Sequence, residues 1–496
     1  MTPYRLLLPM LMLAAAIQAA EGVVAYTPFA LEIIQPHAGL DTRNRFYRAY
    51  PGLEYSVPVS AIGGVFPYRY ALTAAPAGMT IDAATGVITW PNPAEGKVEV
   101  TLTVTDAAKA VQQVGWPITV TSEGWLFVDA AAPEGGTGTR EAPFKTMLQV
   151  YGAKAREGKY SEAHKDRFVY VKDGTYLLDG WTPNGGDVQW TQRQPVVFFA
   201  YPGTRPKLDL TGSFLFADST LDNFYLDGFD VGPMTAKFGF RLTGGSSDVT
   251  FWRTRFSDFA ESTGSDNQSC IMACNGGDGK RWAILDCAFT RVHHGYGIIG
   301  YAVEKLLVGR CSFTEMDGQS SLPVGPKVDC QRWVVRENRF ARNAKQNVWL
   351  YYAHHEKSEN PYGEMEVAYN LIEAGDGPDA YALTINQAAH AVDLPSYIYR
   401  NTILGRVHLF WYKPEFKTMS FRDNVLVGKP ITPDAKTAVV DNIGVTGPAT
   451  AIAASGNLCF DTREGNLNPD GSLVKPVPGK GHVIPPVHPS RAGASP

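Results

Sequence analysis

Between residues 222 and 429, one short pattern of alternating apolar and polar residues occurs eight times. Each copy has an apolar run, a small or polar turn residue, and an apolar closing residue two positions later. The closing residues are Phe229, Phe256, Phe289, Phe313, Phe340, Ile372, Ile403 and Leu426, at intervals of 23 to 33 residues. Because one such unit cannot bury its apolar face alone, the repeat predicts stacked coils joined by loops of variable length.

The turn residues of the repeat form a second regular series. In chain order they are Asp227, Thr254, Cys287, Cys311, Asn338, Asn370, Asn401 and Asn424. Stacked coils repeat at roughly 4.8 Å, so four consecutive Asn at one station predict a hydrogen-bonded ladder. Asn also tolerates the left-handed conformation that such a turn needs. The alternative is that these are ordinary turn residues. At the same station, Cys287 and Cys311 could form a disulfide or remain as two free core thiols.

Another strand is predicted between one repeated motif and the next. If Val348, Leu350 and Leu383 point into the core, the alternate residues point outward. The outward residues are then Trp349, Tyr351, Thr384, Asn386, His408, Phe410 and Tyr412, with Arg241 on an earlier coil. Aromatic rings and hydrogen-bonding groups in such rows suit a long glycan. The alternative is that some of these aromatic residues pack under neighbouring loops.

The repeated motif and its Asn column resemble the right-handed parallel β-helix family, which includes pectate-lyase-like and alginate-lyase-like proteins. The resemblance implies an all-β solenoid that acts on polysaccharides. In related lyases a cation or bound calcium neutralises the uronate carboxylate, and a base removes the C5 proton. Such a base needs a pKa lowered by nearby positive charge or desolvation, and the enolate needs charge stabilisation. Calcium remains an open alternative here, and we predict no specific metal ligands.

Lys327 is the first choice for this base. A Lys at nearly this place resembles the catalytic Lys of alginate-lyase-like and chondroitinase-B-like β-helices, although Ser320, Ser321, Leu322 and Pro323 replace the acidic residues expected just before it. Neighbouring loops on one edge are expected to bring a His close to Lys327. The predicted catalytic residues are Lys327, His293, His294, His354 and Tyr296. The predicted substrate-binding residues are Arg241, Trp349, Tyr351, His408 and Tyr412.

Upstream of the repeat, the chain changes character. Residues 76–90 contain a turn between two strands, and residues 98–106 alternate strictly. This segment resembles the Ig-like or cadherin-like modules of bacterial exported proteins, which act mostly as spacers or weak binders. We therefore predict a linker and Ig-like β-sandwich over residues 21–121. A β-helix with an N-terminal cap follows over 122–475, and a loose Pro-rich tail over 476–496, with an ordered strap as the alternative for the tail.

Composition narrows the functional classes. The 496 residues carry 45 basic and 49 acidic side chains, so no broad cationic field argues for nucleic acid. Residues 1–20, with Arg5 before an apolar core, predict a secretory signal peptide that is too short to span a membrane. We therefore expect a secreted, periplasmic or cell-surface monomer without a transmembrane segment.

Three functional hypotheses remain. The first is a lyase that cleaves an acidic glycan by β-elimination, with a polysaccharide as substrate. The second is a non-catalytic glycan-binding or cell-surface protein that uses the same groove. The third is a glycoside hydrolase, which would need two carboxylates at a fixed separation. Asp317 with Asp376 or Asp379 could supply such a pair.

Overall fold

The structure is a computed structural model, and every structural statement below concerns the residues that it describes. These are residues 29–152, 161–177, 188–189, 196–211, 215–217, 220–235, 238–260, 268–275, 277–293, 295–317, 322–343, 346–352, 363–375, 380–387, 396–410, 419–428, 437–441, 444–445 and 452–482. The predicted signal peptide lies outside them.

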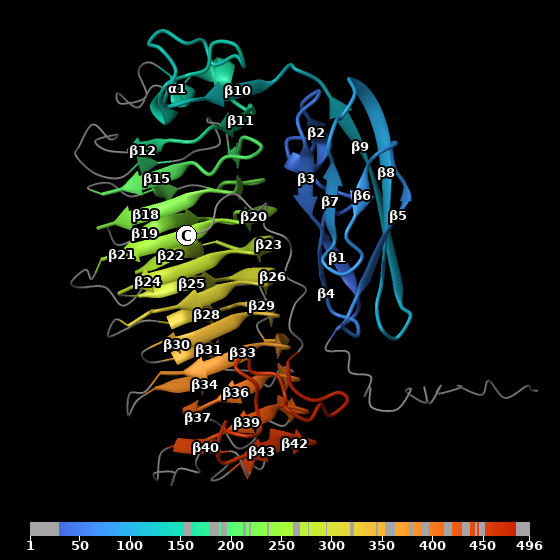
Figure 1. Cartoon of the computed structure of the whole chain (residues 1–496), viewed down its shortest axis with the longest axis vertical. Coiled ribbons are helices and arrows are strands. Elements are labelled where there is room, and N and C mark those ends of the chain that lie inside the picture. Colours follow the sequence, from blue (N-terminus) through green and yellow to red (C-terminus); the bar gives the residue numbers. More distant parts are fainter. Residues whose placement is uncertain are drawn as a thin grey trace, which may run out of the picture.

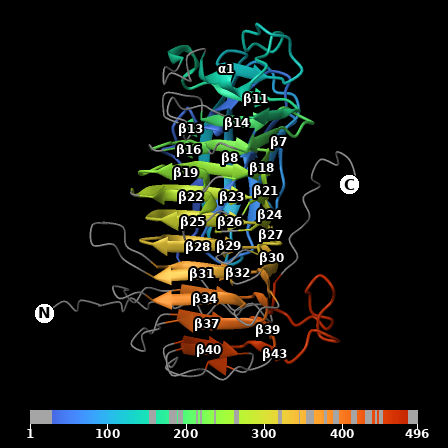
Figure 2. The same ribbon diagram turned by 90° about the vertical axis from the view of Figure 1, so that its left-hand side faces the viewer.

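Three long sheets run the length of a solenoid, and each turn of the chain contributes one strand to each sheet (Figures 1 and 2). Neighbouring strands are parallel, except in the third sheet, where β40 pairs antiparallel with both β37 and β41. The first sheet contains β10 (Trp125–Val128), β11 (Phe168–Val171), β14 (Val197–Ala200), β17 (Tyr225–Asp227), β20 (Val249–Trp252), β23 (Gly279–Leu285), β26 (Val303–Gly309), β29 (Gln331–Arg336), β32 (Met365–Ala368), β35 (Ser396–Tyr399), β38 (Met419–Arg422) and β42 (Ile452–Ser455).

The second and third sheets follow the first within each coil. The second sheet contains β12 (Thr175–Leu177), β15 (Lys207–Leu210), β18 (Asp230–Met234), β21 (Arg255–Phe259), β24 (Ala288–Val292), β27 (Ser312–Thr314), β30 (Arg339–Asn343), β33 (Leu371–Ala374), β36 (Thr402–Leu404), β39 (Val425–Val427) and β43 (Leu458–Phe460). The third sheet contains β13 (Val188–Gln189), β16 (Leu215–Ala217), β19 (Phe238–Thr243), β22 (Ser269–Asn275), β25 (Tyr296–Tyr301), β28 (Leu322–Val328), β31 (Gln346–Tyr352), β34 (Tyr381–Gln387), β37 (Arg406–Phe410), β40 (Thr437–Asp441) and β41 (Gly444–Val445). The predicted parallel β-helix is confirmed.

Stacked side chains fill the core of the solenoid. Phe256, Phe289, Phe313 and Phe340, all closing residues of the repeat, stack with successive ring centroids 4.7–4.8 Å apart and nearly parallel planes. The spacing equals the strand separation, because each ring sits on the same station of the next coil. In the third sheet, the residues predicted to point inward, Val348, Leu350, Leu383 and Val407, are buried.

The predicted Asn ladder is confirmed at the turn from the first sheet to the second. The side-chain oxygen of Asn370 accepts hydrogen bonds from the backbone and side-chain nitrogens of Asn338, at 2.9 and 3.0 Å. Asn370 makes the same contacts to Asn401, and Asn401 to Asn424. The ladder continues one coil beyond the prediction, to Asn457. The repeat therefore extends past residue 429, beyond the eight copies counted in the sequence.

The expected backbone conformation of the ladder residues was wrong. The left-handed residue is the one before each Asn, namely Glu337, Tyr369, Arg400 and Asp423, with φ between 52° and 61°. The bend at this preceding residue lets the Asn side chain turn inward. There its amide nitrogen donates to a backbone carbonyl of the preceding coil. At the same station, Cys287 and Cys311 are free buried thiols that donate to backbone carbonyls.

Residues 32–120 form a small sandwich of antiparallel pairs, apart from a short parallel pairing of β2 with β9. Its strands are β1 (Glu32–Gln35), β2 (Arg48–Ala49), β3 (Tyr55–Pro58), β4 (Ser60–Ile62), β5 (Arg69–Ala74), β6 (Thr80–Ile81), β7 (Val87–Trp90), β8 (Gly96–Thr105) and β9 (Val111–Val120), with a 3-10 turn at Arg45–Tyr47. We call this sandwich the Ig-like module. It lies alongside the first sheet of the solenoid (Figure 1).

Segments outside the regular coils pack near both ends of the solenoid. Helix α1 (Met147–Tyr151) and the 3-10 turn Glu162–His164 lie at the N-terminal end, as predicted for the cap, and Val150 and Tyr151 are buried there. At the other end, residues 461–482 run back along the second sheet. His482 bonds to the Thr402 hydroxyl at 2.8 Å, and Lys480 bonds to Asp423. Of the predicted tail, residues 476–482 follow the ordered strap that was the alternative, and residues 483–496 lie outside the described residues.

Candidate functional site

A histidine and an aspartate meet on the rim where the second sheet passes into the third. Nδ1 of His293 lies 2.7 Å from Oδ1 of Asp317. His293 is 43% and Asp317 63% exposed, so both groups are accessible from solvent. An ionised carboxylate only accepts hydrogen bonds, so in the neutral form of His293 this contact places the proton on Nδ1 and the lone pair on Nε2.

The stacking of the coils explains why these two residues meet. Thr290 of β24 pairs in register with Thr314 of β27 on the next coil. His293 and Asp317 each follow that pair by three residues, so they occupy equivalent positions just beyond the ends of two adjacent strands. The Thr290 and Thr314 hydroxyls, 3.2 Å apart, mark the same alignment.

An ion pair lies beside the His–Asp pair on the same rim. Arg291 donates to both oxygens of Asp258, from Nε at 2.6 Å and from Nη2 at 3.0 Å. The Arg291 hydrogen bond lowers the pKa of Asp258, so this carboxylate stays charged. Asp258, Arg291 and Glu315 all have positive φ, between 53° and 61°. The rim therefore turns sharply at each coil and presents charged side chains outward.

Lys327 lies at the opposite end of the third-sheet strands. It is the penultimate residue of β28, whereas His293 precedes the start of β25. Tyr296 pairs with Leu322 at one end of these strands, and Tyr301 with Val328 at the other. At about 3.3 Å per residue, some 16 Å of strand separates the two ends. Lys327 and His293 are thus not brought together, contrary to the expectation that one edge holds both. The Lys327 ammonium lies 5.6 Å from the centre of the Tyr301 ring instead.

The outer face of the third sheet is largely closed at its centre. Met272, Tyr296, Ile299 and Leu322 form a buried apolar cluster there, and Trp349 packs against it half-buried. Tyr296 and Trp349 stack with ring centroids 6.4 Å apart. The alternative that aromatic residues of this face are covered thus holds in part for Trp349, and Tyr296, predicted to be catalytic, is only 2% exposed. Thr384, expected on the outer surface, is also buried.

The other predicted site residues are placed only in part. Arg241 lies half-buried on β19, in register with Met272 of the outer face. Tyr351 and His408 lie on β31 and β37, where the structure describes the backbone and not the side chains. The remaining candidates, His294, His354, His355, Tyr412, Asp376 and Asp379, fall outside the described residues.

The described part of the chain contains neither a metal-binding cluster nor a membrane-spanning helix. No group of three or more His, Cys, Asp or Glu residues there is arranged to hold a metal ion. No helix within it has the length and hydropathy needed to cross a membrane.

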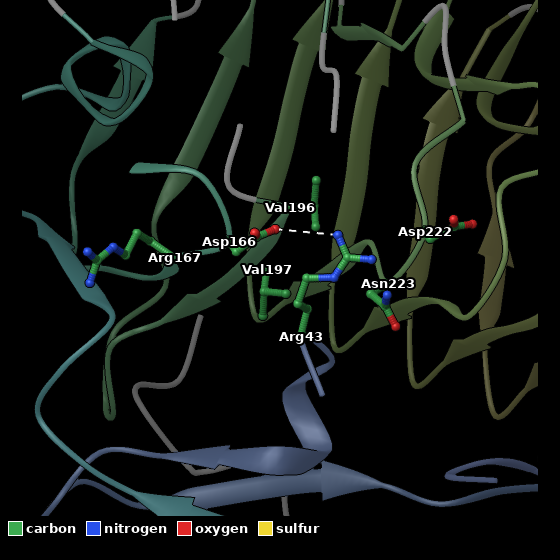
Figure 3. Close-up of a pocket in the computed structure, with 7 residues that line it drawn as sticks. All are labelled: Arg43, Asp166, Arg167, Val196, Val197, Asp222 and Asn223. Carbon is green, nitrogen blue, oxygen red and sulfur yellow. Dashed lines mark ion pairs between the residues drawn. The ribbon is translucent and has the colours of Figure 1, made fainter. Parts of the chain in front are cut away.

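A small recess lies away from this rim, between the Ig-like module and the first coils (Figure 3). It is lined by Arg43, Asp166, Arg167, Val196, Val197, Asp222 and Asn223, and its cavity volume is about 10 Å³. This is room for about one water molecule, far below the roughly 300–1,000 Å³ of typical ligand sites. Arg43 binds Asp41 at 2.6 Å and reaches Asp166 at 3.6 Å. The charges of the recess thus serve the contact between module and solenoid.

Comparison with known proteins identifies the module. Residues 41–121 match the family described as Putative Ig domain, which confirms the Ig-like module. No match was found among curated proteins.

Comparison with solved structures gives remote likenesses. The Family 28 exopolygalacturonase of Yersinia enterocolitica aligns at 8% identity over 82% of this chain and 94% of its own, with a TM-score of 0.29. Two putative alpha-galactosidases of Bacteroides fragilis NCTC 9343, one of them described as alpha-galactosidase/melibiase, align at 14% and 15% identity with TM-scores of 0.18 and 0.15. These alignments cover 38% and 26% of this chain, and the chain spans only 39% and 26% of theirs. At these TM-scores the likenesses carry no argument about function.

Proposed function

We propose that this chain is an exported polysaccharide-active enzyme that cleaves an acidic, uronate-containing glycan by β-elimination. The observation that carries the proposal is the His293–Asp317 pair on an accessible rim of the parallel β-helix. A positioned His with a carboxylate on Nδ1 is a suitable general base near neutral pH. The resemblance of the repeat to β-helix lyases supports the substrate class.

In the proposed reaction, Nε2 of His293 takes the proton from C5 of the uronate. The electron pair left at C5 forms a double bond to C4, and the glycosidic oxygen leaves C4 with its bonding electrons. Asp317 acts as a positioning residue, because it holds the imidazole and stabilises the imidazolium that forms. Lys327 lies too far along the strand to share this step with His293.

The first test measures activity on a panel of uronate polymers, such as polygalacturonate, alginate and hyaluronate. Ultraviolet absorbance of the unsaturated product ends reports β-elimination, and reducing-end formation reports any cleavage. We expect both signals on at least one polymer. Reducing ends without the absorbance would instead indicate a hydrolase, and binding without either signal a glycan-binding protein.

The second test assigns the base. His293→Ala should lower kcat by about 10²–10⁴-fold, the usual contribution of a general base. Asp317→Asn should lower kcat with little change in KM, and Asp317→Glu should restore part of it, which a purely structural role would not do. The matched comparison is Lys327→Ala. If Lys327→Ala abolishes activity and His293→Ala does not, the base assignment is wrong.

One observation favours non-catalytic glycan binding as the second candidate. The centre of the outer face, at Met272 and Ile299, is buried, so a long polymer finds no open floor across these coils. A protein that only binds a glycan can hold it at the rim and does not need an open surface across the third sheet. Isothermal titration with the same polymers separates the candidates, since a binding protein retains affinity after His293→Ala and yields no product.

A further inference from the structure

The Ig-like module contacts the solenoid through a row of polar pairs along successive coils. Chain segment 32–44 runs past the turns that lead into the first sheet. The pairs are Glu32 with Lys305 at 2.9 Å, Gln35 with the Arg281 carbonyl at 2.8 Å, His37 with Asp248 at 3.0 Å and Asn44 with Asn223 at 3.1 Å. These solenoid partners come from four consecutive coils. As the module segment proceeds from residue 32 to residue 44, its partners lie on successively earlier coils. Each of these four coils thus has its own partner on the module.

One arginine of the solenoid is enclosed by the module. Arg336, the last residue of β29, is only 3% exposed. It donates to the Tyr68 hydroxyl at 2.9 Å and to the Ala61 carbonyl at 3.1 Å. Its guanidinium also lies 4.3 Å from the centre of the Phe66 ring. Glu366, on the next coil and 1% exposed, lies 3.6 Å away. Buried, multiply bonded Arg residues of this kind dominate the energetics of interfaces.

The two hydrophobic cores are not separated at this interface. Ile34, Ile62 and Val87 of the module belong to the apolar cluster that fills the solenoid. Conversely, Tyr369 and Tyr399 of the solenoid belong to the module's cluster. Domains joined by small polar interfaces move relative to each other by default, whereas a large apolar interface prevents such motion.

The contact extends toward both ends of the solenoid. At the N-terminal end, Tyr50 of the module packs edge-on against Trp125 and Phe127, with centroids 5.7 and 5.2 Å apart. Toward the C-terminal end, the Tyr369 hydroxyl donates to the Phe66 carbonyl at 3.0 Å. The module ends at Val120 and the solenoid begins at Trp125, so the short linker keeps the two surfaces at high effective concentration.

We propose that the Ig-like module is a fixed lateral brace, so that module and solenoid form one cooperative folding unit. The outer face of the first sheet is then an internal interface and not a surface for ligands. This differs from the spacer or weak binder that the module's sequence class suggests. The inference holds whether or not the chain acts on a glycan.

Peptide-resolved hydrogen exchange of the full chain tests the brace. Strands β8 and β9 report on the module, and β29 and β32 on the solenoid. Arg336→Met should lower protection at least tenfold in both sets of strands, by the same factor, because the two parts open together. The matched control is Arg291→Met, which removes an arginine from a two-bond ion pair elsewhere on the solenoid. It should leave the module strands within about twofold of the wild type.

A milder variant covers the case in which Arg336→Met does not fold. Tyr68→Phe removes a single hydroxyl on the module side, and it should lower protection about three- to tenfold in β29 and β32 as well as in β8 and β9. If Tyr68→Phe affects only β8 and β9, the module is an independent domain and the proposal is overturned. The same conclusion follows if Arg336→Met lowers protection in the solenoid alone.

Discussion

Two regions of the solenoid carry close pairs of ionisable side chains. One is the side that faces the module, and the other is the rim between the second and third sheets. The pairs differ in how far solvent reaches them. On the module side, Arg336 and Glu366 are almost wholly buried and bonded within the protein. On the rim, His293 and Asp317 form a closer pair, 2.7 Å apart, that remains roughly half-exposed. Coils of the same repeat carry both pairs, so the repeat itself does not decide which polar groups are structural and which can react.

Burial makes this difference. A buried polar group that loses its partner costs about 1–3 kcal/mol, whereas an exposed ion pair contributes about 0–1 kcal/mol. Variants on the module side and in the ladder behind it should therefore change stability. Variants on the rim should change activity or binding and leave stability nearly constant.

The largest effect is expected at the centre of the Asn ladder. Asn370→Ala removes the acceptor of the Asn338 backbone and side-chain nitrogens and the side-chain donor to the Val335 carbonyl, so we expect a loss of about 3–5 kcal/mol in the free energy of unfolding. Urea unfolding followed by circular dichroism measures it. Thr314→Ala, which removes a partly exposed hydroxyl pair on the same solenoid, is the control and should cost under about 1 kcal/mol. If both variants lower the free energy of unfolding by the same amount, burial does not explain the difference between the ladder and the rim.

A smaller effect is expected at the C-terminal strap, where the partly buried His482 bonds to the Thr402 hydroxyl. Desolvation lowers its pKa from 6.5 to about 4. The folded protein therefore holds the neutral imidazole, and the stability it contributes is complete above about pH 6.5 and declines as the pH falls toward 4. We expect a loss of about 2 kcal/mol between neutral pH and about pH 5. His482→Gln should flatten this dependence. An unchanged slope would show that another group titrates.

The ladder and the rim also differ in how far the sequence predicts them. Asn338, Asn370, Asn401 and Asn424 share a position in a repeat of nearly constant pattern, so their stacking follows from period alone. Asn457 was missed although Gly456, Asn457 and the apolar residues after it repeat the same motif. The sequence contains this ninth copy of the motif, and aligning residues 456–460 with the eight earlier copies reveals it.

The site was predicted less well because it depends on strand ends and on distant contacts. His293 precedes a predicted strand and Lys327 ends one, so counting strand ends would have placed them on opposite edges. The role of Arg336 could not be read from its motif, because its partners Ala61 and Tyr68 lie more than 260 residues earlier. No local pattern records that the module docks on this coil.

A still smaller effect is expected from the buried acid beside Arg336. Burial raises the pKa of Glu366, against the lowering influence of Arg336. A carboxyl whose folded pKa is raised favours folding at low pH, and this contribution is lost as the pH rises. Glu366→Gln should therefore change stability at neutral pH by no more than about 1 kcal/mol, in contrast to the roughly 3–5 kcal/mol expected when Arg336 is replaced and Glu366 is left unpaired. A large loss in Glu366→Gln, measured by urea unfolding, would mean that the buried charge itself is required.

The smallest effect on stability is expected on the open rim. Asp258 binds Arg291 through both oxygens, yet the two side chains are 44% and 47% exposed, so solvent screens the pair. Asp258→Asn should change the free energy of unfolding by less than about 1 kcal/mol. If the rim binds an anionic polymer, the variant should bind it more tightly, because one negative charge is lost and Arg291 is released. Titration with a uronate polymer at low and high salt measures this, and only the low-salt affinity should rise. A destabilised variant with unchanged affinity would place Asp258 with the structural charges of the module side.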